Sequence, residues 1–143
     1  MIKTNELLEP MEIININFFN GLQNYLKLKN SFLEVKQTNK NFLDFCLNKE
    51  CHICISSNSV KKSLDIRLYI NNNKALYEDL LLHENEIYDK LGFKMTGYNK
   101  NKVSSYFILK KEFNIKNKDS WNDIYKYIIE ISENIYNIFN FYL

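Results

Sequence analysis

Glycine, proline and arginine are scarce in this chain of 143 residues, which contains 3 Gly, 1 Pro and a single arginine, Arg67. Because so few residues break regular backbone structure, long irregular loops are excluded over most of the chain. The lysine- and asparagine-rich, arginine-poor composition is typical of AT-rich coding sequences. A lysine is therefore a weak functional signal in this chain, and Arg67 is a stronger one.

The chain also lacks a long apolar segment, and its first ten residues, MIKTNELLEP, are polar, so we expect neither an export signal nor a membrane span. Its three cysteines, Cys46, Cys51 and Cys54, form no disulfide framework. These absences predict a protein of the reducing cytoplasm. The hydrophobic content of 45% is enough for a core. We expect a flexible leader over residues 1–11 and a single α+β domain over residues 12–143.

Apolar and polar residues alternate in the middle of the chain, as in antiparallel strands with one buried face. The pattern predicts a meander of three strands over residues 42–48, 51–57 and 63–70. A second hairpin follows over residues 93–98 and 103–111. The alternation is clearest in the third strand, where one set of residues faces the core and the other set faces away: Leu64, Ile66, Leu68 and Ile70 against Asp65, Arg67 and Tyr69.

Apolar residues at helical spacing predict three helices, over residues 12–29, 74–91 and about 119–142. Gly21 inside the first helix costs about 1 kcal/mol relative to alanine and indicates a close contact. Ser120 and Asp123 resemble a capping box at the start of the last helix. The broad apolar side of that helix favours packing on the sheet, and a homodimer through it is the alternative.

The expected order is therefore α-β-β-β-α-β-β-α. It predicts an α+β fold in which an antiparallel sheet of about five strands carries three helices mainly on one face. FLEVK, at residues 32–36, is a candidate for one further short extended piece.

Five stretches in a fixed order resemble the family catalogued as domain of unknown function 4268. The similarity covers the chain from about Glu12 to Leu143. The stretches are FFNGLQNYLKLKNSFL, LDIRLYI, NNNKALYEDLLLHENEIYDKLG, SSYFILKK and DSWNDIYKYIIEISENIYNIF.

The resemblance implies a domain that often lies C-terminal to a restriction-endonuclease-like domain, and it transfers no catalytic residues. We expect this chain to depart from that arrangement, because it begins at Met1 and leaves no room for a nuclease domain. The turn Asn48-Lys49-Glu50 also stands where the family would have a glycine-rich turn. We therefore expect a freestanding copy, from a phage or another mobile element, or one that acts in trans with a separate nuclease.

Two groups of residues resemble parts of metal sites. The cysteines together with His52 invite a zinc interpretation, but their spacing fits no common structural zinc pattern, and strand alternation turns Cys51 and Cys54 to opposite faces. Glu34 and Lys36 resemble half of a metal-dependent nuclease motif, which needs a second carboxylate from a neighbouring strand. We expect no catalytic residues, no metal and no cofactor.

The polar side of the meander is the better candidate site, with a lysine-rich hairpin beside it. Arginine, tyrosine and histidine on an open sheet face can bind phosphate or single-stranded nucleic acid. An ordinary solvated face with an Asp–Arg pair is the alternative. The predicted binding residues are His52, Asp65, Arg67, Tyr69, Lys94, Lys100 and Lys102.

The preferred functional hypothesis is a non-enzymatic binding module for a protein or nucleic-acid partner, in a restriction, phage-defence or counter-defence setting. The first alternative is a nucleic-acid-binding accessory protein that uses the basic hairpin. The second is a divergent metal-dependent nuclease around Glu34 and Lys36.

Overall fold

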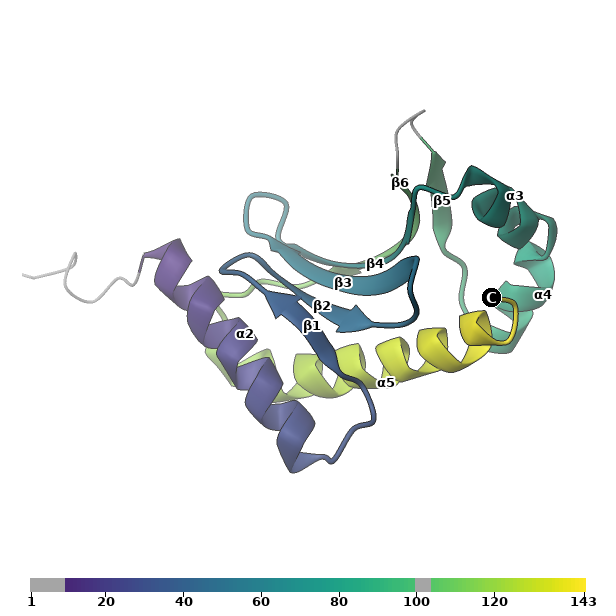
Figure 1. Cartoon of the computed structure of the whole chain (residues 1–143). Coiled ribbons are helices and arrows are strands. Elements are labelled where there is room, and N and C mark those ends of the chain that lie inside the picture. The colour runs from purple at the N-terminus through teal and green to yellow at the C-terminus, as the bar shows by residue number, and fades with distance from the viewer. Residues whose placement is uncertain (1–9, 100–103) are drawn as a thin grey trace, which may run out of the picture.

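The alternating segments form an antiparallel sheet of six strands in the order β1-β2-β3-β4-β6-β5, in a computed structural model that describes residues 10–99 and 104–143 (Figure 1). The strands are β1 (Val35–Thr38), β2 (Phe42–Cys46), β3 (Cys51–Asn58), β4 (Ser63–Asn71), β5 (Thr96–Asn99) and β6 (Ser104–Glu112). The predicted meander and hairpin are confirmed. The hairpin joins the meander through β6, which pairs with β4 over the whole length of both strands.

The sheet has six strands where about five were expected, because the extended piece near residue 35 is a true strand. β1 pairs with β2, and its register shifts between Val35 and Gln37. The shift is a bulge, which bends an edge strand and weakens its alternation. Weak alternation is why the sequence pattern alone marked the piece only as a candidate.

Four helices are present in the described ranges, where three were expected: α2 (Met11–Leu28), α3 (Lys74–Leu82), α4 (Glu84–Leu91) and α5 (Trp121–Asn140). The single helix predicted over residues 74–91 is interrupted at His83. The His83 amide donates to the Leu80 carbonyl at 3.1 Å, while its ring Nδ1 lies 2.9 Å from the Asp79 carbonyl oxygen. The ring thus takes the acceptor that the amide would use in a continuous helix.

The start of the first helix and the start of the last helix also differ from expectation. Pro10 is the N-cap of α2 and Met11 its first residue, so the helix begins inside the expected leader, whose residues 1–9 lie outside the described ranges. Before α5 a 3₁₀ turn, η1 (Lys118–Ser120), gives Ser120 a helical backbone. The Ser120 hydroxyl therefore donates back to the Asn117 carbonyl at 2.8 Å, and the capping-box prediction is wrong.

The helices cover one face of the sheet, and the core lies between the two layers. In Figure 1, α5 runs beneath the sheet, with α2 near one of its ends and the α3–α4 pair near the other. All four core-facing residues predicted in β4 are fully buried: Leu64, Ile66, Leu68 and Ile70. No helix within residues 10–99 and 104–143 is long and apolar enough to cross a membrane.

Candidate functional site

The opposite face of the sheet, which we call the polar face, carries the candidate site. None of the helices in the described ranges lies over it (Figure 1). It consists of alternate residues of the four central strands: Phe42, Asp44 and Cys46 of β2, His52, Cys54 and Ser56 of β3, Asp65, Arg67 and Tyr69 of β4, and Tyr106, Ile108 and Lys110 of β6.

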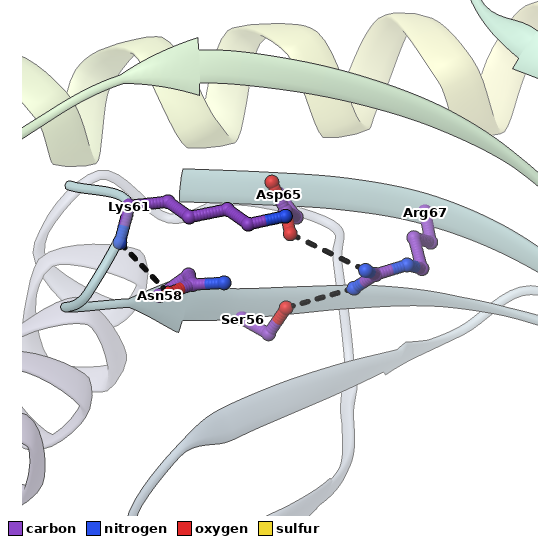
Figure 2. A network of polar contacts seen from close by, with 5 residues as sticks. All are labelled: Ser56, Asn58, Lys61, Asp65 and Arg67. Carbon is purple, nitrogen blue, oxygen red and sulfur yellow. Dashed lines mark hydrogen bonds and ion pairs between the residues drawn. The ribbon is translucent and has the colours of Figure 1, made fainter. Parts of the chain in front are cut away.

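Arg67 lies at the centre of the polar face and is held on three sides. Its Nη1 donates to the Ser56 hydroxyl at 2.9 Å, and its Nη2 donates to Oδ2 of Asp65 at 3.2 Å, as Figure 2 shows. The guanidinium carbon also lies 5.3 Å from the centroid of the Tyr106 ring. Because a guanidinium is planar and always charged, these contacts fix a permanent cation in one orientation.

Asp44 forms a second polar centre, two strands away. Its Oδ2 accepts a hydrogen bond from Gln37 Nε2 at 2.9 Å and lies 3.7 Å from His52 Nε2. Burial lowers the pKa of His52 and outweighs the opposing effect of the Asp44 carboxylate, while Lys36 lowers it further. The contact between His52 and Asp44 is therefore one between a neutral imidazole and a carboxylate at neutral pH, and not an ion pair.

An aromatic row crosses the polar face from β3 to β5: His52, Tyr69, Tyr106 and Tyr98. The rings of His52 and Tyr69 stack with centroids 5.1 Å apart and planes 14° apart. Tyr69 and Tyr106 are tilted by 54° at 5.2 Å, and Tyr106 and Tyr98 stack at 5.3 Å and 6°. Burial is the main cause of the raised pKa of Tyr69. The row comes from the register of four strands, and each ring is supported by the next.

A pocket of about 370 Å³ opens at the β5 end of the polar face. Its lining consists of Arg67, Lys94, Thr96, Tyr98, Tyr106, Ile108, Leu109 and Lys110. Three cationic side chains thus meet two tyrosine rings there. A few charged groups around an aromatic floor are typical of a ligand site.

Several buried polar atoms of this face have no hydrogen-bond partner among the described residues. They are Oδ1 of Asp44 and of Asp65, Nδ1 of His52, Oγ of Ser63 and Nε of Arg67. Asp44 and Asp65 are only 2% and 4% exposed. Buried polar groups are usually satisfied, so such a concentration on one face distinguishes it from an ordinary solvated surface.

The fold brings most of the predicted binding residues together. His52, Asp65, Arg67 and Tyr69 lie on two paired strands, because His52 is opposite Tyr69 in the β3–β4 register. Lys94 lines the pocket with Arg67. The predictions for Lys100 and Lys102 lie outside the described residues.

Sequence reasoning missed Asp44, Tyr98, Tyr106 and Lys110 as members of the site. The alternation of β2 already turned Asp44 away from the core. Tyr106 joins the site only because β6 pairs with β4, which sets Tyr106 opposite Tyr69. No local pattern in β4 or β6 predicts which residues of the two strands lie opposite one another. The alternation of apolar and polar residues in β6 does predict that Tyr106 lies on the polar face.

The residues of the two metal hypotheses lie apart. Cys51 belongs to the core, whereas Cys46 and Cys54 lie on the polar face, and all three thiols are free. Burial raises the pKa of Cys51 to about 11 and that of Cys54 further still. Glu34 lines a different pocket, of about 530 Å³, at the end of α2. Within the part of the chain that the structure describes, no group of three or more His, Cys, Asp or Glu side chains could hold a metal ion.

Comparison with known proteins gives one match. The family described as "Domain of unknown function (DUF4268)" matches residues 14–143. No curated protein and no solved structure matches the chain.

Proposed function

The chain belongs to the DUF4268 family, a domain of unknown function, and on that premise we propose that it is a non-enzymatic binding module that docks a partner on its polar face. The setting we propose is restriction, phage defence or counter-defence. That setting rests on the expectation that domains of this family often accompany a restriction-endonuclease-like domain.

The observation that carries the proposal is the contrast between the two faces of the sheet. One face is covered by helices and packs into the hydrophobic core. The other holds Arg67 against the buried carboxylate of Asp65, with a second buried carboxylate, Asp44, two strands away, and it has polar atoms that lack partners among the described residues. Immobile, partly unsatisfied polar groups favour binding, because little side-chain freedom is lost when a partner docks.

The charge around the pocket favours an anionic partner. Lys94 and Lys110 are exposed at its rim, and Arg67 forms part of its lining. The carboxylates are less accessible to a partner, because Asp65 is engaged by Arg67 and Asp44 lies toward β1. A cationic rim attracts an anionic partner and accelerates its association.

The test uses two adjacent lysines of β6 that face opposite sides of the sheet. Lys110 is opposite Asp65 of the polar face, whereas Lys111 is opposite the core residue Leu64 and its Nζ lies 5.0 Å from the Tyr127 ring of α5. Tagged wild type, Lys110→Glu and Lys111→Glu are expressed in the native host. What copurifies is identified by mass spectrometry and by nucleic-acid sequencing.

We expect Lys110→Glu to release a partner that wild type and Lys111→Glu retain. Both substitutions change the net charge by the same amount. A difference in partner retention between the two variants therefore identifies the face of the sheet that binds the partner. A partner released by Lys111→Glu and retained by Lys110→Glu would contradict docking on the polar face.

A nucleic-acid-binding accessory protein is the second candidate. One observation favours it: Lys94, from the segment that leads into the β5–β6 hairpin, lines the same pocket as Arg67 and the two tyrosines Tyr98 and Tyr106. Lys94 and the tyrosine end of the aromatic row therefore belong to one surface, and the two hypotheses share a site.

A further inference from the structure

We infer that the partner is a single-stranded nucleic acid, and that it lies across the aromatic row with its backbone against Arg67, Lys94 and Lys110. The inference rests on the proposed function and specifies the partner for the same site. It follows from three features of the pocket at the β5 end of the polar face: its rings, its fixed cation and its flexible cations.

The rings supply surfaces on which bases can stack. Tyr106 and Tyr98 are parallel to within 6° with centroids 5.3 Å apart, and both line the pocket. Tyr98 is 41% exposed, although large aromatic side chains are mostly buried elsewhere in this chain. Every base has an apolar face, so stacking on tyrosine binds a strand without requiring a particular sequence.

Arg67 supplies a cation that is already in position. Its contacts with Ser56, Asp65 and Tyr106 use both Nη atoms and one ring face, while its Nε has no partner among the described residues. Because Nη1 and Nη2 each carry a second hydrogen, the guanidinium can donate to a phosphate or a base edge while it keeps these contacts. Arg67 lines the same pocket as Tyr98 and Tyr106.

Lys94 and Lys110 supply the flexible cations. Both are exposed and line the pocket, Lys110 from β6 and Lys94 from the segment that precedes β5, so the phosphates of a strand stacked on Tyr98 and Tyr106 can reach them. Lysine acts on phosphate as a point charge and needs no fixed geometry. A phosphodiester chain matches this arrangement, because it carries one charge for each base that stacks.

A duplex fits the site less well than a single strand does. The bases of a duplex are stacked on one another, so their faces are not available to Tyr106 or Tyr98. The pocket, at about 370 Å³, is at the small end of the range for ligand sites. It suits an unpaired base with its phosphate more than the edge of a helix.

The binding test measures fluorescence anisotropy with labelled oligothymidylate and oligouridylate, each about 12 nucleotides long. A duplex of equal length and inorganic polyphosphate serve as competitors. Salt is varied from about 25 to about 200 mM, because the salt dependence counts phosphate contacts. The two oligonucleotides distinguish DNA from RNA as the natural strand, and tighter binding of either supports the inference.

Matched variants separate stacking from charge. We expect Tyr106→Phe to bind as wild type does, whereas Tyr106→Leu, which keeps an apolar side chain but removes the ring, weakens binding about fivefold or more. Lys110→Gln should reduce the slope of log K against log salt by about 0.7, and Lys111→Gln should leave it unchanged. Circular dichroism of each variant establishes that it is folded.

The outcomes are distinct. Binding of polyphosphate as tight as that of the oligonucleotides, with no effect of Tyr106→Leu, would make the site a general anion surface and overturn the inference. Failure of both oligonucleotides to bind at the lowest salt would also overturn it. If a host partner is nevertheless released by Lys110→Glu, the proposed function survives with a different partner. If neither oligonucleotide binds and Lys110→Glu also releases no host partner, the inference of a nucleic acid and the proposed docking on the polar face both fail.

Discussion

Gly21 of α2 lies directly against Tyr125 of α5, and a Cβ at residue 21 would overlap the Tyr125 hydroxyl. That hydroxyl donates a buried hydrogen bond of 2.7 Å to the Phe18 carbonyl, one turn earlier in α2. Burial raises the pKa of Tyr125, in keeping with a neutral donor. The missing side chain at residue 21 therefore lets the two helices approach closely enough for a tyrosine on one to bond the backbone of the other.

Gly21→Ala should destabilise the protein even though alanine favours helix by about 1 kcal/mol. The overlap forces Tyr125 to move, and we expect a net loss of about 1–3 kcal/mol in the free energy of unfolding. Tyr125→Phe removes the hydrogen bond and should cost about 1 kcal/mol. Urea denaturation of both single variants and of the double variant measures the coupling.

The double variant should be more stable than the sum of the two single losses predicts, because Tyr125→Phe removes the atom nearest to the new Cβ. If the two losses in the free energy of unfolding simply add, the contact between residue 21 and the Tyr125 hydroxyl is contradicted. Gly92→Ala is the control, since a Cβ at residue 92 meets no atom within 4 Å but the backbone has a φ of +84°. Its cost, about 1–2 kcal/mol, should be independent of Tyr125.

Local patterns predicted every central strand and the ends of the long helices to within a few residues. Alternation is a strong signal where one face is sealed, as in β4, whose four core-facing residues are all fully buried. The close contact expected for Gly21 is confirmed by the neighbouring Tyr125. These features depend on residues near one another in sequence, or on burial alone.

What the sequence did not reveal depends on long-range pairing. Tyr69 and Tyr106 are 37 positions apart in number and become neighbours only through the β4–β6 register. The break at His83 depends on which of two donors takes the Asp79 carbonyl, and the spacing of apolar residues is the same either way. The candidate residues on β3 and β4 were therefore found, whereas Tyr98, Tyr106 and Lys110, on the strands that complete the face, were missed.

Stability should fall as the pH drops below about 6.5, the ordinary pKa of histidine, because of His52. Burial lowers the pKa of His52 in the folded state, so the unfolded chain binds the proton more readily and acid favours unfolding. The stabilising contribution of His52 is fully present above its pKa in the unfolded chain, and it is lost as the pH falls toward its lower pKa in the folded protein.

His52→Gln should therefore make the free energy of unfolding less dependent on pH between about 7.5 and about 5.5 than it is in wild type. Urea titrations at several pH values in this range measure the two slopes. Equal slopes would mean that His52 is no more buried in the folded protein than in the unfolded chain.

Alkylation should distinguish the three cysteines by their burial. Cys51 and Cys54 are 2% and 8% exposed, and burial raises the pKa of both thiols, whereas Cys46 is half-buried. The thiolate is the reactive form, so iodoacetamide at about pH 8 should label Cys46 first. Mass spectrometry of peptides gives the order in which the three cysteines are alkylated. In concentrated urea the three cysteines should be alkylated at similar rates. Labelling of native Cys54 as fast as Cys46 would contradict its burial.

Arg67→Lys should destabilise the protein although it conserves the charge. A lysine has one nitrogen and cannot reproduce the fork by which the guanidinium bonds both Ser56 and Asp65 next to the Tyr106 ring, so Asp65, at 4% exposure, loses part of its charge compensation. We expect a loss of about 1–3 kcal/mol in the free energy of unfolding.

The double variant Arg67→Met with Asp65→Asn tests this reason for the loss. Removing the arginine alone leaves a buried carboxylate without its partner, whereas removing both charges leaves none. The double variant should therefore be more stable in urea denaturation than Arg67→Met alone. If it is no more stable, Asp65 does not depend on Arg67 for its charge compensation, and the guanidinium is held chiefly by Ser56 and the Tyr106 ring.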